Sequence, residues 1–138
     1  MTKAEVFRFL NRNPVFFLAT QNLDQPRVRA MRLMKADENG IVFYTSTLKD
    51  LYRQLQGHHK VELCFLDRQE ERQVRVDGNV ELSDDLELRK TIVEKQPFLI
   101  PIVEKNGYEV IAPYFLRDAK AFVWDMKSNF LPKTYIRL

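Results

Sequence analysis

Basic side chains crowd one short stretch of the sequence, in which two segments of alternating apolar residues are divided by a turn. The cations of this stretch are Arg27, Arg29, Arg32, Lys35 and Lys49. Pairing between two strands needs no positive charge, so these side chains either face water or bind an anionic ligand.

Lys49 stands where a positive charge by itself is mildly unfavourable. It falls in the first turn of a predicted helix, whose N-terminal end already carries partial positive charge. A bound anion would explain this position, because the hydroxyls of Ser46 and Thr47, free backbone N–H groups and Lys49 could all contact it. A phosphate is the natural candidate. The spacing alone also allows Lys49 and Arg27 to be solvated surface charges.

The alternation of side chains along a strand separates the arginines of this stretch. Arg29 and Lys35 fall on one face and Arg32 falls on the other. Arg29 and Arg32 can then contact one ligand only if the strand bends or bulges between them, as strands of barrels often do.

Helices that could position these residues are indicated by caps and by apolar period. Thr2 and Glu5 have the spacing of a capping box, which predicts a short helix that ends near Asn13-Pro14. A second helix is predicted after the basic stretch, with Ser46 or Thr47 as its cap. Its apolar stripe consists of Leu48, Leu51, Tyr52 and Leu55. A third helix is predicted from the cap at 83–85 through Glu94.

Strands are predicted from runs of β-branched and aromatic residues between turn signals. They span residues 15–20, 27–35, 41–45, 60–66, 71–82 and 119–126. The second and third are expected to pair as a hairpin. Because strands joined by short turns form antiparallel sheets, and about six of them tend to close and remove their edges, we predict an α+β fold with a six-stranded antiparallel barrel.

Composition narrows the classes of partner. Lys and Arg number 22 against 19 Asp and Glu, a balance that does not suggest a nucleic-acid binder. No apolar run approaches the roughly 20 residues of a membrane span, and the N-terminus is too polar for a secretory signal. One cysteine, Cys64, allows no internal disulfide. We therefore expect a cytoplasmic protein without nucleic-acid or membrane partners.

Side chains that often carry catalysis do not combine into a known set here. The adjacent pair His58 and His59 has no further ligand at metal-binding spacing, so no metal site is predicted. No nucleophile with a base and an orienting group is recognisable, and the catalytic residues stay unknown.

Four segments together resemble the pyridoxamine 5'-phosphate oxidase-like, FMN-binding split-barrel family. They are "QPRVRAMRLMK", "GIVFYTS" followed by Lys49, "VELCF" and "ERQVRVDGNVEL", in the family's order over roughly residues 13–85. The length and form look most like the short relatives grouped with nitroimidazole reductases and general stress proteins. The resemblance implies a single split β-barrel domain over residues 1–138, with flanking short helices.

The resemblance also implies a cofactor site. The residues that it assigns to FMN are Arg29, Ala30, Met31, Arg32, Tyr44, Thr45, Ser46, Lys49 and Gln73. In the family, Lys49's counterpart binds the phosphate and Gln73's counterpart approaches the flavin ring across a homodimer interface. Lys35 is a candidate on the substrate side. A homodimer with flavin at its interface is also favoured by the apolar segments "PFLIPIV" and "APYFL", unless these complete the core of one chain.

The implied function is an FMN-dependent oxidoreductase that reduces a small, for example nitroaromatic, acceptor with electrons from NAD(P)H or another donor. FMN is favoured over FAD because no dinucleotide fingerprint is present. The end of the chain, "FLPKTYIRL", has no Arg-x-His, so pyridoxamine phosphate oxidase activity itself is not expected. The sequence leaves open a non-catalytic flavin-binding redox sensor or stress module, and a split barrel that binds haem or a deazaflavin.

Overall fold

The predicted capping box starts the first helix, α1 (Lys3–Arg12). The Thr2 hydroxyl accepts a hydrogen bond from the Glu5 N–H at 3.2 Å, and the Glu5 carboxylate accepts one from the Thr2 N–H. Hydrogen bonds from the Thr2 backbone and side chain to the Glu5 carboxylate lower the pKa of Glu5. Val6, Phe9 and Leu10 are fully buried, so this helix covers one end of the sheet with its apolar face.

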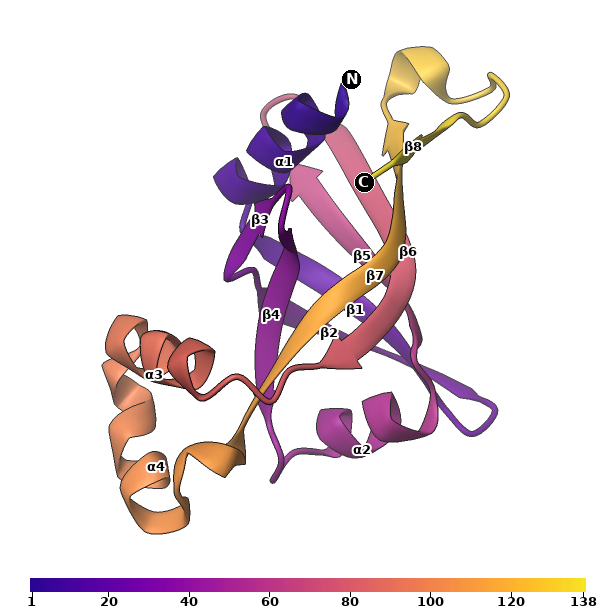
Figure 1. Cartoon of the computed structure of the whole chain (residues 1–138). Coiled ribbons are helices and arrows are strands. Elements are labelled where there is room, and N and C mark those ends of the chain that lie inside the picture. The colour runs from indigo at the N-terminus through magenta and orange to yellow at the C-terminus, as the bar shows by residue number, and fades with distance from the viewer.

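The computed structural model, which describes all residues from Met1 to Leu138, has one sheet of eight strands and four helices (Figure 1). The strands are β1 (Val15–Asn22), β2 (Gln25–Arg32), β3 (Lys35–Asp37), β4 (Gly40–Ser46), β5 (Lys60–Asp67), β6 (Arg72–Leu82), β7 (Ile111–Trp124) and β8 (Tyr135–Arg137). The other helices are α2 (Asp50–Gly57), α3 (Leu86–Lys95) and α4 (Ile100–Asn106), with 3₁₀ turns at Pro97–Leu99, Tyr108–Val110 and Met126–Ser128. No helix has both the length and the apolar character needed to cross a membrane.

The sheet runs in the order β2-β1-β5-β6-β7-β4-β3, with β8 added to β7, and every pair is antiparallel. The α+β class and the antiparallel sheet are as predicted, but the count of six strands was too low. Of β3, Lys35 had been assigned to a longer strand and Ala36 and Asp37 to a turn, and β8 had been assigned to the tail.

The expected hairpin of residues 27–35 with 41–45 is wrong. β2 pairs with β1 over its whole length, and of the predicted strand 27–35 only its last residue, Lys35 at the start of β3, pairs with β4. The link between β2 and β3 consists of Leu33 and Met34. The Leu33 N–H donates to the Pro14 carbonyl at 2.7 Å, whereas the Met34 N–H donates to the Val42 carbonyl at 2.9 Å. The chain therefore crosses from one edge of the curved sheet to the other in this link, while no ladder of hydrogen bonds joins β2 to β4.

Two prolines, Pro101 and Pro113, lie inside secondary structure that was not predicted in the C-terminal half. Pro113 was taken as a break, yet it lies buried inside β7, which starts at Ile111 instead of residue 119. Pro101 lies in the first turn of α4, where a missing N–H costs nothing. The segment "APYFL" lies almost wholly in the core of this chain, whereas "PFLIPIV" forms the start of α4 and leaves Phe98 exposed.

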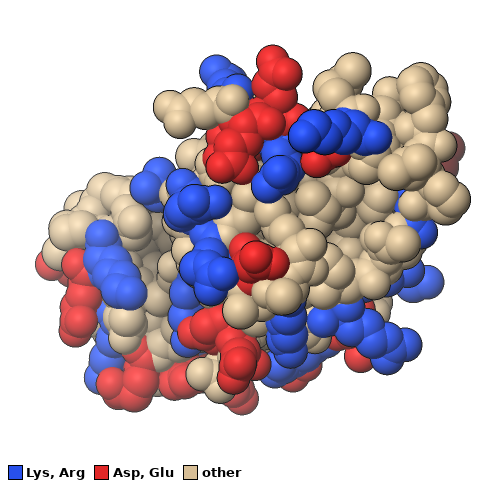
Figure 2. All heavy atoms as spheres, turned by 90° about the horizontal axis from the view of Figure 1, so that it is seen from above, with Lys and Arg blue, Asp and Glu red and all other residues tan.

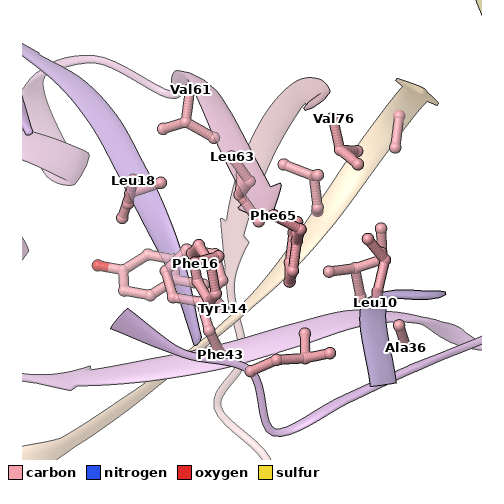
Figure 3. Packing of buried hydrophobic residues seen from close by; sticks show 14 of the residues in the cluster. Leu10, Phe16, Leu18, Ala36, Phe43, Val61, Leu63, Phe65, Val76 and Tyr114 are labelled. Atoms are coloured by element: carbon pink, nitrogen blue, oxygen red, sulfur yellow. The ribbon is translucent and has the colours of Figure 1, made fainter. Parts of the chain in front are cut away.

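Aromatic rings from separate strands meet inside the curved sheet (Figure 3). The Phe16 and Phe65 rings stack with centroids 4.9 Å apart, and Phe43 contacts Phe16 edge-on at 5.8 Å. Tyr114 stacks on Phe43 at 5.9 Å. These rings belong to a cluster of 23 buried residues. A second, smaller cluster packs α3 and α4 against β4 and β7.

The hydroxyl of Tyr114 is buried in this core without a hydrogen-bond partner. The Tyr114 side chain is 1% exposed, and burial, followed by the nearby Tyr52, raises its pKa from 10.0 to about 12. As pH rises, the unfolded chain therefore loses this proton before the folded chain does. The stability that depends on the neutral hydroxyl is complete below pH 10 and is lost as the pH rises toward 12.

We predict that a Tyr114→Phe variant loses less stability than the parent chain between pH 10 and pH 12, because phenylalanine has no proton to lose. Urea denaturation of both proteins across this range measures the difference. At pH 7 the variant should be at least as stable, since the hydroxyl that it lacks has no partner. Equal losses in both proteins at high pH would contradict the assignment.

Candidate functional site

A cavity of about 1300 Å³ lies in the gap between β2 and β4, with α2 and α4 completing its walls. The gap exists because the two edges of the sheet are tied together only near Leu33 and Met34. In Figure 1, α2 and α4 lie near the end of β4 that is remote from α1 and from both termini. The fold thus leaves β2, an edge strand, as one open wall of the cavity.

Eight of the residues expected to contact a cofactor line this cavity. They are Arg29, Ala30, Met31 and Arg32 from β2, Tyr44, Thr45 and Ser46 from β4, and Lys49 from the link to α2. The structure does not bring Lys35 or Gln73 to the cavity. Lys35 lies on β3 opposite Val42, and Gln73 lies on β6 between Leu66 and Trp124.

Arg29 and Arg32 both reach the cavity without the bulge that their spacing was expected to require. The β1–β2 register is regular, with Leu18 opposite Arg29 and Val15 opposite Arg32, so the two arginines belong to opposite faces. Because β2 has no neighbour on its outer side, residues from both of its faces can line the open edge.

The Arg29 guanidinium is fixed by neutral oxygen atoms. It donates to the Thr20 hydroxyl at 2.7 Å, to Gln54 Oε1 at 2.6 Å and to the Leu18 carbonyl at 3.2 Å. The Thr20 hydroxyl also donates to Gln54 Oε1 at 2.6 Å. Burial and, to a smaller extent, the charge of Arg27 lower the pKa of Arg29. An arginine nevertheless stays protonated at neutral pH, so the charge is held in place but is not neutralised.

Positive charge exceeds negative charge around the cavity. Its cationic residues are Arg27, Arg29, Arg32, Lys49 and Arg53, against the single carboxylate of Asp50. Asp50 pairs with Arg53, and none of the other four forms an ion pair. Elsewhere basic and acidic side chains are interspersed, as on the face shown in Figure 2, so the excess is local. Such a cavity attracts an anion.

The start of α2 differs from its prediction and adds hydrogen-bond donors. Lys49 is the N-cap residue in extended conformation, and no side chain caps the helix. The Ser46 hydroxyl instead accepts from the N–H of Leu48. Leu48 was predicted as part of the apolar stripe, but it precedes the helix and is 60% exposed. The backbone N–H groups of Asp50 and Leu51 donate to no protein acceptor. Free N–H groups beside Lys49 suit an anion.

The opposite side of the cavity is apolar. Phe98 and Leu99, on the 3₁₀ turn before α4, and Ile102 of α4 line it together with Ile111. Phe98, Leu99 and Ile102 are called the α4 wall below. Tyr44 lies at the boundary, since it lines the cavity and also packs against the α3–α4 cluster. Burial raises the pKa of the Tyr44 hydroxyl, which therefore remains protonated at neutral pH.

Several lining residues carry no signal in the sequence. Arg27 had been left undecided between ligand and solvent, while Asn22, Asp50, Arg53 and Gln54 had no motif to mark them. Phe98 and its neighbours were hidden because Pro97 and Pro101 were read as punctuation instead of as the start of two short helical turns.

Comparison with known proteins agrees with this architecture. The family model described as pyridoxamine 5'-phosphate oxidase matches residues 2–99. A pyridoxine/pyridoxamine 5'-phosphate oxidase of Thermosynechococcus vestitus is 43% identical over 65 residues, which cover 46% of this chain and 31% of the relative. The corresponding protein of Allorhizobium ampelinum is 31% identical over 63% of this chain and 42% of its own length. The match thus spans less than half of these curated relatives.

Solved structures resemble the chain over almost its full length. A NimC/NimA family protein of Clostridium acetobutylicum has a TM-score of 0.79 at 22% identity, covering 98% of this chain and 92% of its own. General Stress Protein 26 of Bacillus anthracis has a TM-score of 0.69 at 13% identity, with coverages of 99% and 98%. These likenesses show a shared fold. With the family match over residues 2–99, they establish that the chain belongs to the pyridoxamine 5'-phosphate oxidase-like family of FMN-binding split barrels.

Proposed function

We propose that this chain binds FMN and acts as an oxidoreductase that reduces a small acceptor, such as a nitroaromatic, with electrons from NAD(P)H. The observation that carries the proposal is the cavity at the open edge of the sheet. It combines four cations without ion pairs and free N–H groups on one side with an apolar wall on the other. FMN has the matching parts, a single phosphate and a flat, largely apolar ring.

The residues present fit this cofactor. Lys49, Arg29 and Arg32 supply charge for a phosphate, and the N–H groups of Asp50 and Leu51 supply hydrogen bonds. Met31 and Tyr44 offer contact surface for the ring and ribityl chain. When bound, FMN supplies the electron transfer that no side chain of the cavity can supply.

The chain's own contribution is position, charge and exclusion of water. The hydrogen bonds from Arg29 to Thr20 and Gln54 hold its guanidinium before a ligand arrives, so little reorganisation is needed on binding. The protonated Tyr44 hydroxyl can donate a hydrogen bond at the boundary between the charged and apolar walls. The apolar wall excludes water from the ring.

Names of relatives support the cofactor more than any one substrate. A structure from Nostoc punctiforme, described as a pyridoxamine 5'-phosphate oxidase-related FMN-binding protein, has a TM-score of 0.60 at 15% identity, with coverages of 99% and 96%. The curated oxidases match over less than half their length. We therefore propose a nitroaromatic acceptor, which the resemblance of the sequence to nitroimidazole reductases implies, and not pyridoxamine phosphate.

We further propose a homodimer in which a second copy covers the cavity. An apolar patch of Val15, Phe17 and Val28, which are 51%, 43% and 69% exposed, lies on the outer face of β1 and β2. Phe17 is opposite Ala30 and Val15 is opposite Arg32, and both partners line the cavity. A second copy seated on this patch would therefore also close the cavity mouth.

Gln73 supports this arrangement by its place in the sheet. The strand registers put Phe17 opposite Cys64 and Cys64 opposite Arg75, so Gln73 shares the outer face with the patch. Gln73 Oε1 lies 3.8 Å from Cys64 Sγ. In a dimer formed through this face, Gln73 of one copy can approach the cavity of the other.

The cofactor assignment predicts that the protein without cofactor binds FMN more tightly than FAD, because the cavity offers one group of cations and no dinucleotide fingerprint is present. Fluorescence titration of the apoprotein with each flavin measures both affinities. Tighter binding of FAD would contradict the assignment. A purified protein with a sharp haem band near 400 nm, instead of flavin bands, would do so too.

The charge assignment predicts that Lys49→Ala weakens FMN binding roughly tenfold, because one charge-assisted contact to phosphate is lost. The fold should be unaffected, since Lys49 is exposed and lies outside both buried clusters. Lys95→Ala, at the exposed end of α3, is the matched control and should leave affinity unchanged. Equal affinities for the two variants would show that Lys49 is a solvated charge.

The dimer assignment predicts a mass near twice the 16.4 kDa of one chain by light scattering. Phe17→Glu places a charge in the middle of the patch and should yield monomers with weaker FMN binding. Leu23→Glu, in the turn between β1 and β2 and 82% exposed, is the control and should remain dimeric. A monomeric parent protein that binds FMN tightly would refute the shared site.

A further inference from the structure

The two sides of the cavity differ sharply in chemistry. All of its charged residues belong to β2 or to the segment Lys49–Arg53, whereas the α4 side offers Phe98, Leu99 and Ile102 with no charged group. Lys35, the expected cation of the substrate side, lies on β3 outside the cavity. One group of cations therefore serves the cavity, and none of its members belongs to the α4 wall.

Packing against the protein core holds most of the α4 wall in place before any ligand binds. Leu99 and Ile102 pack against the buried cluster that includes Ile92 and Val93, which fixes their positions. Phe98 is 71% exposed on the 3₁₀ turn that precedes α4, so its ring is free to cover a ligand at the mouth. A rigid apolar wall with one exposed ring is suited to a flat apolar molecule.

Once FMN occupies the cations, the charge of a second ligand decides whether it can bind against the α4 wall. A ligand phosphate placed against Phe98, Leu99 and Ile102 would lose water without gaining a cation or a hydrogen-bond donor, which is costly. An uncharged ring placed there loses only unfavourable contact with water. The wall therefore favours uncharged over phosphorylated ligands.

We propose that Phe98, Leu99 and Ile102 form the acceptor subsite, and that it selects uncharged planar aromatic molecules and disfavours phosphorylated ones. This inference rests on the proposed function, because FMN is taken to occupy the cationic side. It goes further in naming the wall that selects the acceptor and the property that this wall selects.

Binding of 1-naphthol and 1-naphthyl phosphate, which share one ring system and differ by the phosphate, tests the inference without turnover. Each probe is titrated by fluorescence or calorimetry into the apoprotein and into protein saturated with oxidised FMN. We expect FMN to weaken 1-naphthyl phosphate binding at least tenfold, because both need the same cations, and to change 1-naphthol binding less than threefold. The proposal would be overturned if 1-naphthyl phosphate bound the FMN-loaded protein as tightly as the apoprotein, or more tightly.

Variants of the exposed ring locate the subsite. Phe98→Ala should weaken 1-naphthol binding at least fivefold without changing FMN affinity, while Leu86→Ala, an exposed apolar residue of α3 outside the cavity, should change neither. Phe98→Arg should restore 1-naphthyl phosphate binding to the FMN-loaded protein. Unchanged 1-naphthol binding in Phe98→Ala would refute the subsite.

The apoprotein arm separates this proposal from the cofactor assignment. If FMN does not bind but 1-naphthol still binds in a Phe98-dependent way, the proposed cofactor is wrong and the apolar subsite stands. If FMN binds and Phe98 has no influence on either probe, the cofactor assignment stands and the subsite is wrong.

Discussion

The crossing at Leu33 and Met34 is the constraint on which the rest of the molecule depends. Consecutive N–H groups of this link bond to opposite ends of the strand order, at Pro14, which precedes β1, and at Val42 of β4. The edges are therefore tied together at that point, and elsewhere β2 and β4 remain unpaired with each other. The cavity occupies the gap that results, and α2 and α4 cover it because they follow β4 and precede β7 in the chain. Without this crossing, β2 would be an ordinary exposed edge and its arginines would face solvent.

The site gathers like charges, which by itself opposes folding. Arg27, Arg29, Arg32 and Lys49 surround one space without a carboxylate for any of them, and Arg29 is held by neutral oxygens instead. A salt bridge to Arg29 would relieve the repulsion but would also cancel the charge that a phosphate needs. The stability that the site gives up must come from elsewhere, and the stacked rings of Phe16, Phe43 and Phe65 supply apolar burial for it. An anionic ligand would relieve the repulsion and stabilise the folded chain.

Structural features that depend on neighbouring residues could be predicted from the sequence. The capping box at Thr2 and Glu5 involves neighbours along the chain, and it is formed as predicted. The pairing of β2 was mistaken because β2 has an adjacent strand on each side in the sequence, and it forms its hairpin with the preceding β1 and not with the following β4. The residues of β2 and β4 that the resemblance assigned to a cofactor do line one cavity, although spacing alone left Arg27 and Lys49 undecided. Phe98 escaped notice because an exposed phenylalanine between prolines carries no periodic signal. Gln73 lies on the outer face of the sheet and does not line the cavity of its own chain, so its assignment rests on the proposed second copy.

A comparison of FMN with riboflavin tests whether the cations of the cavity bind a phosphate, because the two molecules differ only in that group. Fluorescence titration of the apoprotein with each molecule at low and at moderate salt measures the contribution of the phosphate. If the cations bind the phosphate, FMN should bind at least about a hundredfold more tightly than riboflavin, equivalent to roughly 2.7 kcal/mol. Added salt should narrow this difference in affinity. Equal affinities for the two flavins at both salt concentrations would show that the cations do not bind the phosphate.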